Sequence, residues 1–188
     1  MSMKREIRVL GIDDSPFDKF SNRFVTVIGA FFRGGSHMDG LVSTRIAVDG
    51  NNATKKLSEM INSSRFKAQL KCVMIDGINM GGFNVIDIHK LNRSTKVPVI
   101  VVVRRRPDLP NIKRILTRLG MSRKIALLDK AGPPLKCGKI FIQFAGISFE
   151  EASEIVKLTA THSYLPEPIR VAHLIGAGLV FGESKGNA

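Results

Sequence analysis

The chain has 188 residues, of which 44% are hydrophobic and 24% are charged, a balance that excludes an intrinsically disordered chain. It carries 29 lysines and arginines against 16 acidic residues, a net charge of +13, so the protein is expected to attract polyanions. No apolar run reaches the roughly 18 residues of a membrane span. The N-terminus becomes strand-like and acidic too early for a signal peptide, which predicts a cytoplasmic protein with no membrane partner.

The first part of the chain predicts strands that are joined by turns. Apolar, β-branched runs alternate with sequences rich in Asp, Ser, Pro and Gly, a pattern typical of hairpin-connected strands. A segment with apolar residues at helical spacing follows them. We expect strands at 6–13, 23–32 and 41–48 and a helix within 49–64.

From residue 70 the pattern changes to alternating strands and helices. Two almost uninterrupted apolar runs, 70–76 and 97–103, are typical of strands that are buried on both faces of a sheet. Hairpins followed by this alternation predict one α/β domain over residues 1–188, with a mixed sheet flanked by helices. The remaining expected elements are helices at 83–94, 108–119, 148–161 and 166–182, a strand at 139–145 and a possible short edge strand at 124–129.

Aspartates stand at the expected ends of three strands. Asp13 or its neighbour Asp14 ends the first strand, Asp49 follows the third and Asp76 ends the fourth. If the first and fourth strands are parallel neighbours, their carboxylates lie roughly 5 Å apart. Carboxylates at that distance repel unless a cation such as Mg²⁺ or Mn²⁺ lies between them. The alternative is that each aspartate only completes a turn, and the role of Asp14 stays open.

Basic residues concentrate between Arg104 and Lys130. This segment holds nine lysines and arginines against Asp108 and Asp129, which is more than half of the net positive charge of the chain. Such clustering favours a phosphate-binding face and a nucleic-acid partner, whereas a merely solvated helix face is the alternative. The candidate phosphate contacts are Arg104, Arg105, Arg106, Lys113 and Arg114.

Few aromatic residues are available for stacking on nucleobases. The chain has one Tyr and no Trp, so stacking would depend on phenylalanine. Recognition of backbone and shape is therefore favoured over sequence-specific readout. The candidate stacking residues are Phe17, Phe31, Phe32 and Phe83.

The histidines show no metal-ligand spacing. His89 and His173 fall on expected helices, where we interpret them as surface or hydrogen-bonded core residues, and His37 lies in a glycine-rich loop. Ser15 and Ser148 have no histidine base near them in sequence, which argues against a serine hydrolase.

Five short motifs carry a resemblance to a known family. The segments "VLGIDDSPF", "RIAVDG", "VMIDG", "VPVIVVVR" and "LPEPIRVAH" occur in the order and spacing of the endonuclease V superfamily. The chain is most similar to the small uncharacterised relatives of that superfamily, known as domain of unknown function family 99. The likeness spans nearly the whole chain, and it implies a ribonuclease H-like fold.

The resemblance also implies a site. Endonuclease V holds magnesium with two aspartates and a glutamate to cleave phosphodiesters, and by motif Asp13 and Asp76 match the aspartates while Asp49 stands in the place of the glutamate. Arg104 falls where the family has a lysine, so a planar guanidinium with fixed donor directions replaces an ammonium group on a flexible side chain. The catalytic histidine that the family carries before a helix beginning like "ISFEEA" has no counterpart in "QFAGISFEEA".

Two main functions follow from these residues, and an enzyme that acts on a small phosphate-containing molecule is a minor third option. The first is an endonuclease V-like, metal-dependent hydrolase that uses Asp13, Asp49 and Asp76 to cleave nucleic-acid phosphodiesters. The second is a nucleic-acid-binding protein that kept the fold and lost the reaction together with the catalytic histidine. The sequence leaves open whether the substrate is DNA or RNA, and it does not indicate the oligomeric state.

Overall fold

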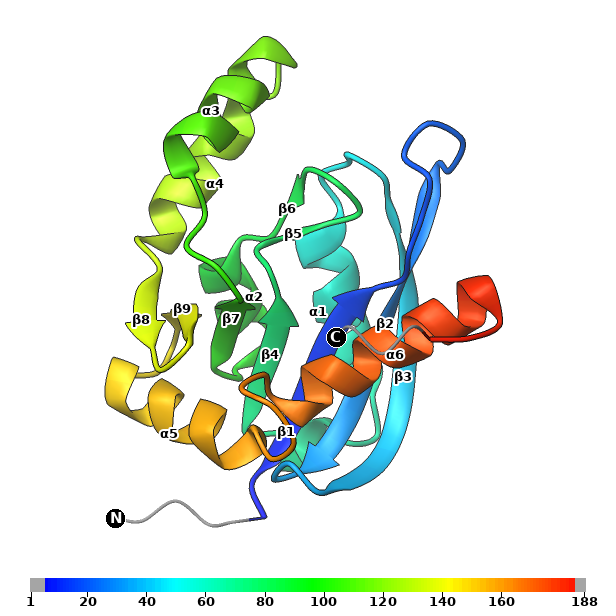
Figure 1. Cartoon of the computed structure of the whole chain (residues 1–188), viewed down its shortest axis with the longest axis vertical. Helices are drawn as coiled ribbons and strands as arrows, with labels where there is room; N and C mark the ends of the chain where they lie inside the picture. The colour runs from blue at the N-terminus through cyan, green and yellow to red at the C-terminus, as the bar shows by residue number, and fades with distance from the viewer. Residues whose placement is uncertain (1–5, 185–188) are drawn as a thin grey trace.

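The computed structural model describes residues 6–184. Its main sheet is built from β1 (Arg8–Asp14), β2 (Phe24–Arg33), β3 (His37–Ala47), β4 (Cys72–Asp76), β7 (Val99–Val103), β8 (Leu135–Cys137) and β9 (Ile140–Ala145). These seven strands lie in the order β3-β2-β1-β4-β7-β9-β8 (Figure 1). The central strands β1, β4 and β7 run parallel, while each strand outside them is antiparallel to its inner neighbour.

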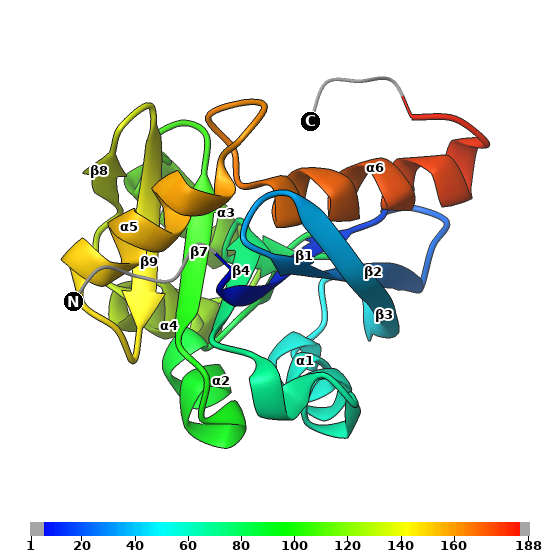
Figure 2. The same cartoon turned by 90° about the horizontal axis from the view of Figure 1, so that it is seen from below.

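Helices cover both faces of this sheet. They are α1 (Ala53–Ser63), α2 (Ile88–Thr95), α3 (Leu109–Arg118), α4 (Arg123–Ala131), α5 (Phe149–Thr159) and α6 (Glu167–Phe181), with a 3₁₀ turn at Lys67–Gln69. Figure 2 shows α1 and α2 on one side of the sheet and α5 and α6 on the other. Among the residues that the structure describes, no helix is long and apolar enough to cross a bilayer.

The alternation of side chains along β1 connects the strand to two separate cores. Leu10 and Ile12 belong to the core beneath α1 and α2, whereas Val9 belongs to the core beneath α5 and α6. Since successive strand residues point to opposite faces, Gly11 and Asp13 lie on the same face as Val9. The first aspartate of the Asp-Asp pair is therefore directed towards α6.

The predicted mixed sheet with flanking helices is confirmed, and most expected elements are present. The short edge strand expected at 124–129 is wrong, because this segment is part of helix α4. Ile125 and Leu128 pack beside Leu116 of α3, a spacing that suits a helix as well as a short strand. The edge strand is instead β8, and the helix expected from residue 83 begins at Ile88. Before it, β5 (Asn79–Met80) and β6 (Asn84–Val85) form a small ribbon.

Helix α6 approaches β1 more closely than side chains would normally permit. A Cβ placed on Gly11 would lie 2.1 Å from the carbonyl carbon of Pro168, and one placed on Gly176 would lie 3.0 Å from the Cα of Ser15. Ala172, on the same face of α6, is fully buried. The small residues at these positions let α6 lie almost against the strand that carries Asp13.

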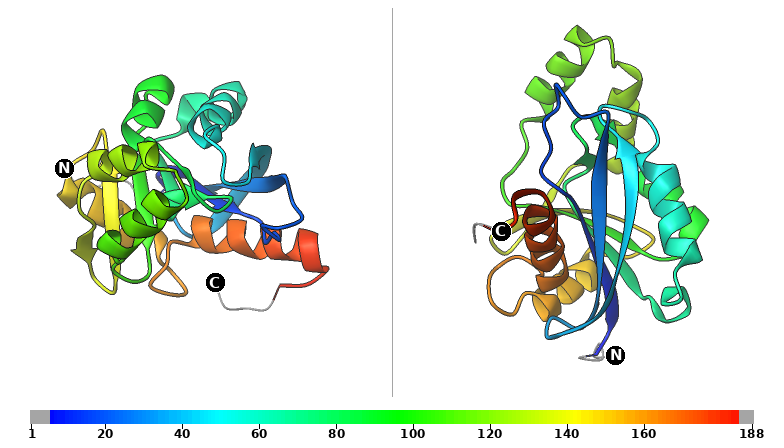
Figure 3. Two further views of the ribbon diagram at one scale, coloured as in Figure 1. Left: turned by 90° about the horizontal axis from the view of Figure 1, so that it is seen from above. Right: turned by 90° about the vertical axis from the view of Figure 1, so that its right-hand side faces the viewer.

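Helices α3 and α4 form a hairpin that projects from the body of the protein (Figures 1 and 3). A small third core of Val85, Leu116 and Leu128 holds the hairpin to the β5–β6 ribbon. The hairpin follows β7 directly, so it leaves the sheet at the edge where the parallel strands end.

Substitution of Gly11 by alanine is expected to destabilise the protein, because the added methyl group meets the backbone of Pro168 rather than a flexible side chain. We expect a loss of roughly 2–4 kcal/mol in the free energy of unfolding, measured by chemical denaturation. Gly178→Ala is the matched control. Gly178 lies on α6, as Pro168 does, and nothing lies within 4 Å of a Cβ added there. That variant should be about 0.5–1 kcal/mol more stable than the natural protein. Equal effects of the two substitutions would contradict the close packing of α6.

Candidate metal centre at the sheet edge

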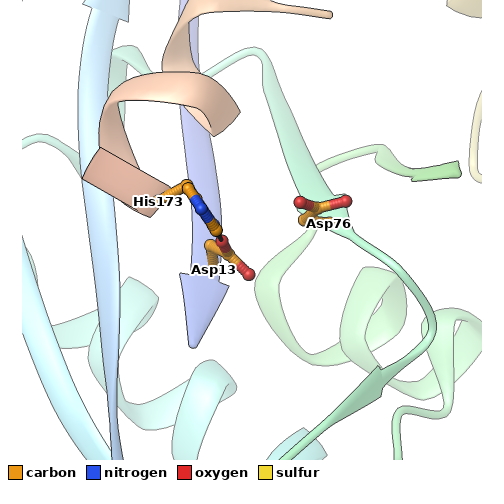
Figure 4. A group of neighbouring side chains, drawn as sticks. All are labelled: Asp13, Asp76 and His173. Carbon is orange, nitrogen blue, oxygen red and sulfur yellow. Dashed lines mark hydrogen bonds and ion pairs between the residues drawn. The ribbon is translucent and has the colours of Figure 1, made fainter. Parts of the chain in front are cut away.

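Asp13 and Asp76 lie side by side at the carboxyl edge of the central strands. Ile12 pairs with Ile75 in the parallel ladder of β1 and β4, so the residues that follow each of them are neighbours. The two carboxylates and the ring of His173 each offer one ligand atom, and these three atoms lie within 4.8 Å of one another. Figure 4 shows the three side chains converging from two strands and one helix. The convergence of the two aspartates is the geometry that the sequence analysis expected.

His173 joins the aspartates from α6, a contact that the sequence analysis did not predict. Its Nδ1 lies 2.8 Å from Oδ2 of Asp13, and the contact depends on the close packing of α6 over Gly11. The interpretation of His173 as a surface or hydrogen-bonded core histidine did not assign it to the site, whereas the structure gives it Asp13 as its hydrogen-bond partner. The chain has no histidine at the position of the catalytic histidine of endonuclease V. His173 nevertheless reaches the acidic pair from α6.

Asp14 approaches the same place from the other face of β1. Its Oδ2 accepts a hydrogen bond of 2.9 Å from the backbone N–H of Gly81, which ties the β5–β6 ribbon to the end of β1. Asp13, Asp14, Asp76 and His173 together line an open pocket of about 390 Å³. Asp14 therefore belongs to the wall of the site as well as to its scaffold.

Arg104 lies at the same edge, as expected for a residue that directly follows β7. Its Nη2 is 3.4 Å from Oδ2 of Asp76, and its Nε is buried without a hydrogen-bond partner among the described residues. The guanidinium of Arg104 thus places a positive charge beside the carboxylate of Asp76.

The acidic side chains are held where ionisation is unfavourable. Burial raises the pKa of Asp13 from 3.8 to about 6; the hydrogen bond with His173 opposes this rise, and the negative charges of Asp76 and Asp14 add to it. Burial also raises the pKa of Asp14, against the hydrogen bond from Gly81, and the pKa of Asp76, against the charge of Arg104. The hydrogen bond with Asp13 raises the pKa of His173. Despite the nearby Arg104 and His173, the pKa values of the three carboxyl groups stay raised, so additional positive charge would be favourable there.

Asp49 does not join this group. It lies in the turn after β3 with a φ of 53°, and its Oδ1 accepts a hydrogen bond of 2.7 Å from the backbone N–H of Phe83. Among the described residues, the cluster of potential metal ligands comprises Asp13, Asp76 and His173 without it. The expectation that Asp49 would supply a third carboxylate to the pair is corrected here, because its side chain is turned towards the backbone of the β5–β6 ribbon.

The basic segment divides into cations with internal partners and cations that face solvent. Lys124 is buried, and its Nζ donates to the carbonyl oxygens of Asp49, Gly50 and Phe83 at 2.6–2.9 Å, so it holds loops together. Lys113 forms an ion pair with Asp129. Arg114 donates to the side chain of Asn111, and Lys130 pairs with Asp87.

Arg105 and Arg106, in contrast, are exposed at the carboxyl edge of the sheet. For these two arginines, no hydrogen bond or ion pair is found within residues 6–184.

Two of the four expected stacking residues are inaccessible. Phe31 and Phe32 are buried in the two opposite cores, so the sequence expectation for them was wrong. Phe17 and Phe83 are partly buried.

The sequence profile of the family described as Endonuclease dU matches residues 5–180. The chain belongs to the endonuclease dU family. A "UPF0215 protein" from Methanosarcina acetivorans is 46% identical over 193 residues, which cover 99% of this chain and 97% of that relative. A crystal structure of a protein of unknown function from Archaeoglobus fulgidus has a TM-score of 0.87 at 38% identity, over 93% of this chain and 99% of that chain.

Endonuclease V shares the fold of this family. The Ciona intestinalis enzyme, solved in complex with DNA that contains an inosine, has a TM-score of 0.56 at 16% identity, over 88% of this chain and 82% of that chain. Identity this low shows the fold alone. The predicted likeness to the endonuclease V superfamily and the predicted ribonuclease H-like sheet are both confirmed.

The donor set of this endonuclease dU family member suits a hard divalent cation. Asp13 and Asp76 offer carboxylate oxygens, which Mg²⁺ prefers, and the imidazole of His173 is a ligand that Mn²⁺ also accepts. The raised pKa values of these buried carboxyl groups show that added positive charge would be favourable there. The residues present therefore fit a divalent metal ion.

The charge of Asp13 is expected to destabilise the metal-free protein above about pH 6. Because the pKa of Asp13 rises from 3.8 to about 6 on folding, the folded state binds more protons than the unfolded state between these values, and stability falls as the pH rises through this window. Asp13→Asn removes the charge, so in a chelator near pH 8 it should be on the order of 1–3 kcal/mol more stable than the natural protein. The difference should vanish near pH 4, where the folded natural protein is protonated at Asp13.

Thermal denaturation with added Mn²⁺ provides the complementary measurement. Mn²⁺ should raise the melting temperature of the natural protein, since a ligand that binds only the folded state stabilises it, and should leave Asp13→Asn unchanged. An equal increase in both proteins would exclude Asp13 as a ligand.

Proposed function

We propose that this protein is a metal-dependent endonuclease that hydrolyses phosphodiester bonds in DNA near deoxyuridine. The observation that supports a hydrolase is the approach of ligand atoms from Asp13, Asp76 and His173 to within 4.8 Å of one another at the carboxyl edge of the sheet. The name of the family, Endonuclease dU, supports the choice of deoxyuridine. The protein would act in the cytoplasm, as the sequence analysis expects.

Asp13 and Asp76 would hold Mg²⁺ or Mn²⁺, with His173 as a third ligand or as a neighbour of the ion. A bound divalent ion would lower the pKa of a water molecule and would stabilise the charge that develops on the phosphate. In the tautomer with a proton on Nδ1, His173 would donate a hydrogen bond to Asp13, and this contact would fix the orientation of the ring. Nε2 of the same ring is then the atom that would exchange a proton with the substrate.

The basic edge of the sheet would bind the phosphates on either side of the reacting bond. Arg105 and Arg106 are exposed, and Arg104 already lies against Asp76. Lys113 and Arg114 lie on α3 of the projecting hairpin and would extend the positive surface along the bound DNA strand. Contacts of this kind give affinity without sequence specificity and weaken with salt.

Asp49 takes a structural role in this proposal. Its carboxylate holds the backbone of Phe83, and Gly82 packs so closely that an added Cβ would lie 2.3 Å from Oδ1 of Asp49. It would keep the β5–β6 ribbon next to Asp14 and thus shape the wall of the site.

The second function inferred from the sequence, a protein that binds nucleic acid without cleaving it, rested on the missing histidine. The contact of His173 with Asp13 places an imidazole beside the acidic pair and weakens that argument. The structure therefore supports the hydrolase better than the non-catalytic protein.

The proposal is tested with end-labelled DNA that contains a single deoxyuridine, incubated with the protein and either Mg²⁺ or Mn²⁺. The natural protein should cleave it, and Asp76→Asn should reduce the rate by roughly two orders of magnitude or more, because it removes a charged ligand of the metal. Undamaged DNA and DNA containing deoxyinosine report on the choice of base.

Asp39→Asn is the matched control for this substitution. Asp39 is paired with Arg33 near the opposite end of the sheet, so its loss should leave cleavage unchanged. Equal rates in the natural protein and Asp76→Asn would remove Asp76 from the reaction. DNA binding without cleavage under any divalent metal would favour the non-catalytic protein instead.

A further inference from the structure

The loop between β1 and β2 presents an aromatic ring to solvent. Phe20, within this β1–β2 loop (residues 15–23), is 89% exposed, the largest exposed fraction among the large hydrophobic residues in the described part of the chain. Scattered exposed apolar residues are common on protein surfaces. Phe20 differs from such residues in the hydrogen-bonded turn that holds it and in the lysine beside its ring.

Hydrogen bonds within the loop hold Phe20 in this exposed position. The carboxylate of Asp18 accepts from the backbone N–H of Phe20 and from the hydroxyl of Ser21, both at 2.9 Å. Asp18 and Asn22 then close the turn, because the backbone N–H of each donates to the other over 2.8 Å. The acidic residue of the loop is therefore engaged within the turn, and the turn is pre-organised with its aromatic side chain outward.

The loop projects from the same edge of the sheet as the candidate metal centre. Asp14 pairs with Val27, and the N–H of Ser15 donates to the carbonyl of Thr26. Phe24, where β2 begins, lies three residues before Val27, so β2 extends about 10 Å beyond the Asp14–Val27 pair towards the loop. Figure 1 shows this loop and the α3–α4 hairpin rising from the same end of the sheet, with the ends of β1 and β4 between them.

Cations accompany the exposed rings in this region. Nζ of Lys19 lies 5.0 Å from the centroid of the Phe20 ring, and the guanidinium carbon of Arg45 lies 5.5 Å from that of Phe24, which is also partly exposed. Aromatic faces next to positive charge at the edge of a nucleic-acid site are the elements that bind a strand by stacking and phosphate contact.

We propose that Phe20 stacks on an unpaired nucleobase of the DNA strand that crosses the metal centre, with Lys19 contacting an adjacent phosphate. This assignment rests on the proposed function for the path of the strand. Stacking would fix the strand on the β1–β2 side, opposite the arginines that follow β7. It would also supply the base contact that the buried Phe31 and Phe32 do not provide.

The absence of tryptophan from the chain makes a direct spectroscopic test possible. Phe20→Trp introduces a single indole at the tip of the loop, and stacking on a base should quench its fluorescence when a short single-stranded or duplex oligonucleotide containing deoxyuridine is added in a chelator. Tyr164→Trp is the matched control, because Tyr164 is also exposed, at 51%, and lies in the segment before α6 whose Thr161 contacts Gly35 in the turn between β2 and β3, at the other end of the sheet. Its fluorescence should not change.

Fluorescence anisotropy of the labelled oligonucleotide measures affinity in parallel. Phe20→Ala should weaken binding roughly 10-fold or more, as expected for the loss of one stacking contact, while Phe20→Trp retains affinity and Tyr164→Ala leaves it unchanged. These measurements need no cleavage, so quenching without any cleavage would reject the endonuclease and keep the stacking role.

Three results would overturn the stacking role. One is oligonucleotide binding without quenching of the indole at position 20, and another is no binding by the natural protein. The third is an indole that responds to anionic lipid vesicles and not to the oligonucleotide, which would make the loop a membrane-surface contact instead.

Discussion

The close contact between α6 and β1 is the constraint on which the candidate site depends. Gly11 leaves room for the backbone of Pro168, and the helix can then approach until His173 reaches Asp13 at 2.8 Å. The parallel pairing of β1 with β4 brings Asp76 to the same point. Residues separated by 160 positions in the sequence thus meet because one position in the strand has no side chain. Stability and site geometry are linked at Gly11, since a side chain there would displace the helix that carries the histidine.

The electrostatic balance at this edge favours the binding of a cation. The largely buried carboxyl groups of Asp13, Asp14 and Asp76 lie near the guanidinium of Arg104 and the imidazole of His173. Burial raises the pKa of each carboxyl group, so the folded protein carries an electrostatic cost that a divalent ion would offset. More than half of the net positive charge of the chain lies in the segment from Arg104 to Lys130, mostly outside the pocket, where a polyanion would meet it. The two regions of opposite charge are complementary to a phosphodiester with a metal ion beneath it.

Much of this arrangement could be predicted from the sequence, for physical reasons that differ between residues. Asp13 and Asp76 end runs of apolar residues, and the ends of buried parallel strands meet at one edge, so their convergence followed from pattern alone. His173 could not be placed in the same way, since its contact with Asp13 depends on how closely α6 packs. A signal for it does exist: a histidine on a largely buried helix, beside small residues at 172 and 176, needs a hydrogen-bond partner. Asp49 could not be excluded from the site because the backbone conformation of its turn, with φ of 53°, sets the direction of its side chain. The segment 124–129 was ambiguous, because a short apolar run fits either a strand or a helix until its neighbours are known.

The central claim is that Asp13 and Asp76 share one divalent cation, and anomalous scattering tests it most directly. Crystals of the protein soaked in Mn²⁺ and measured near the manganese absorption edge should show an anomalous peak between the two carboxylates, within coordination distance of an oxygen from each. The peak should be lost in crystals of Asp76→Asn. Manganese bound elsewhere on the protein, with no peak between these residues in the natural sequence, would contradict the account.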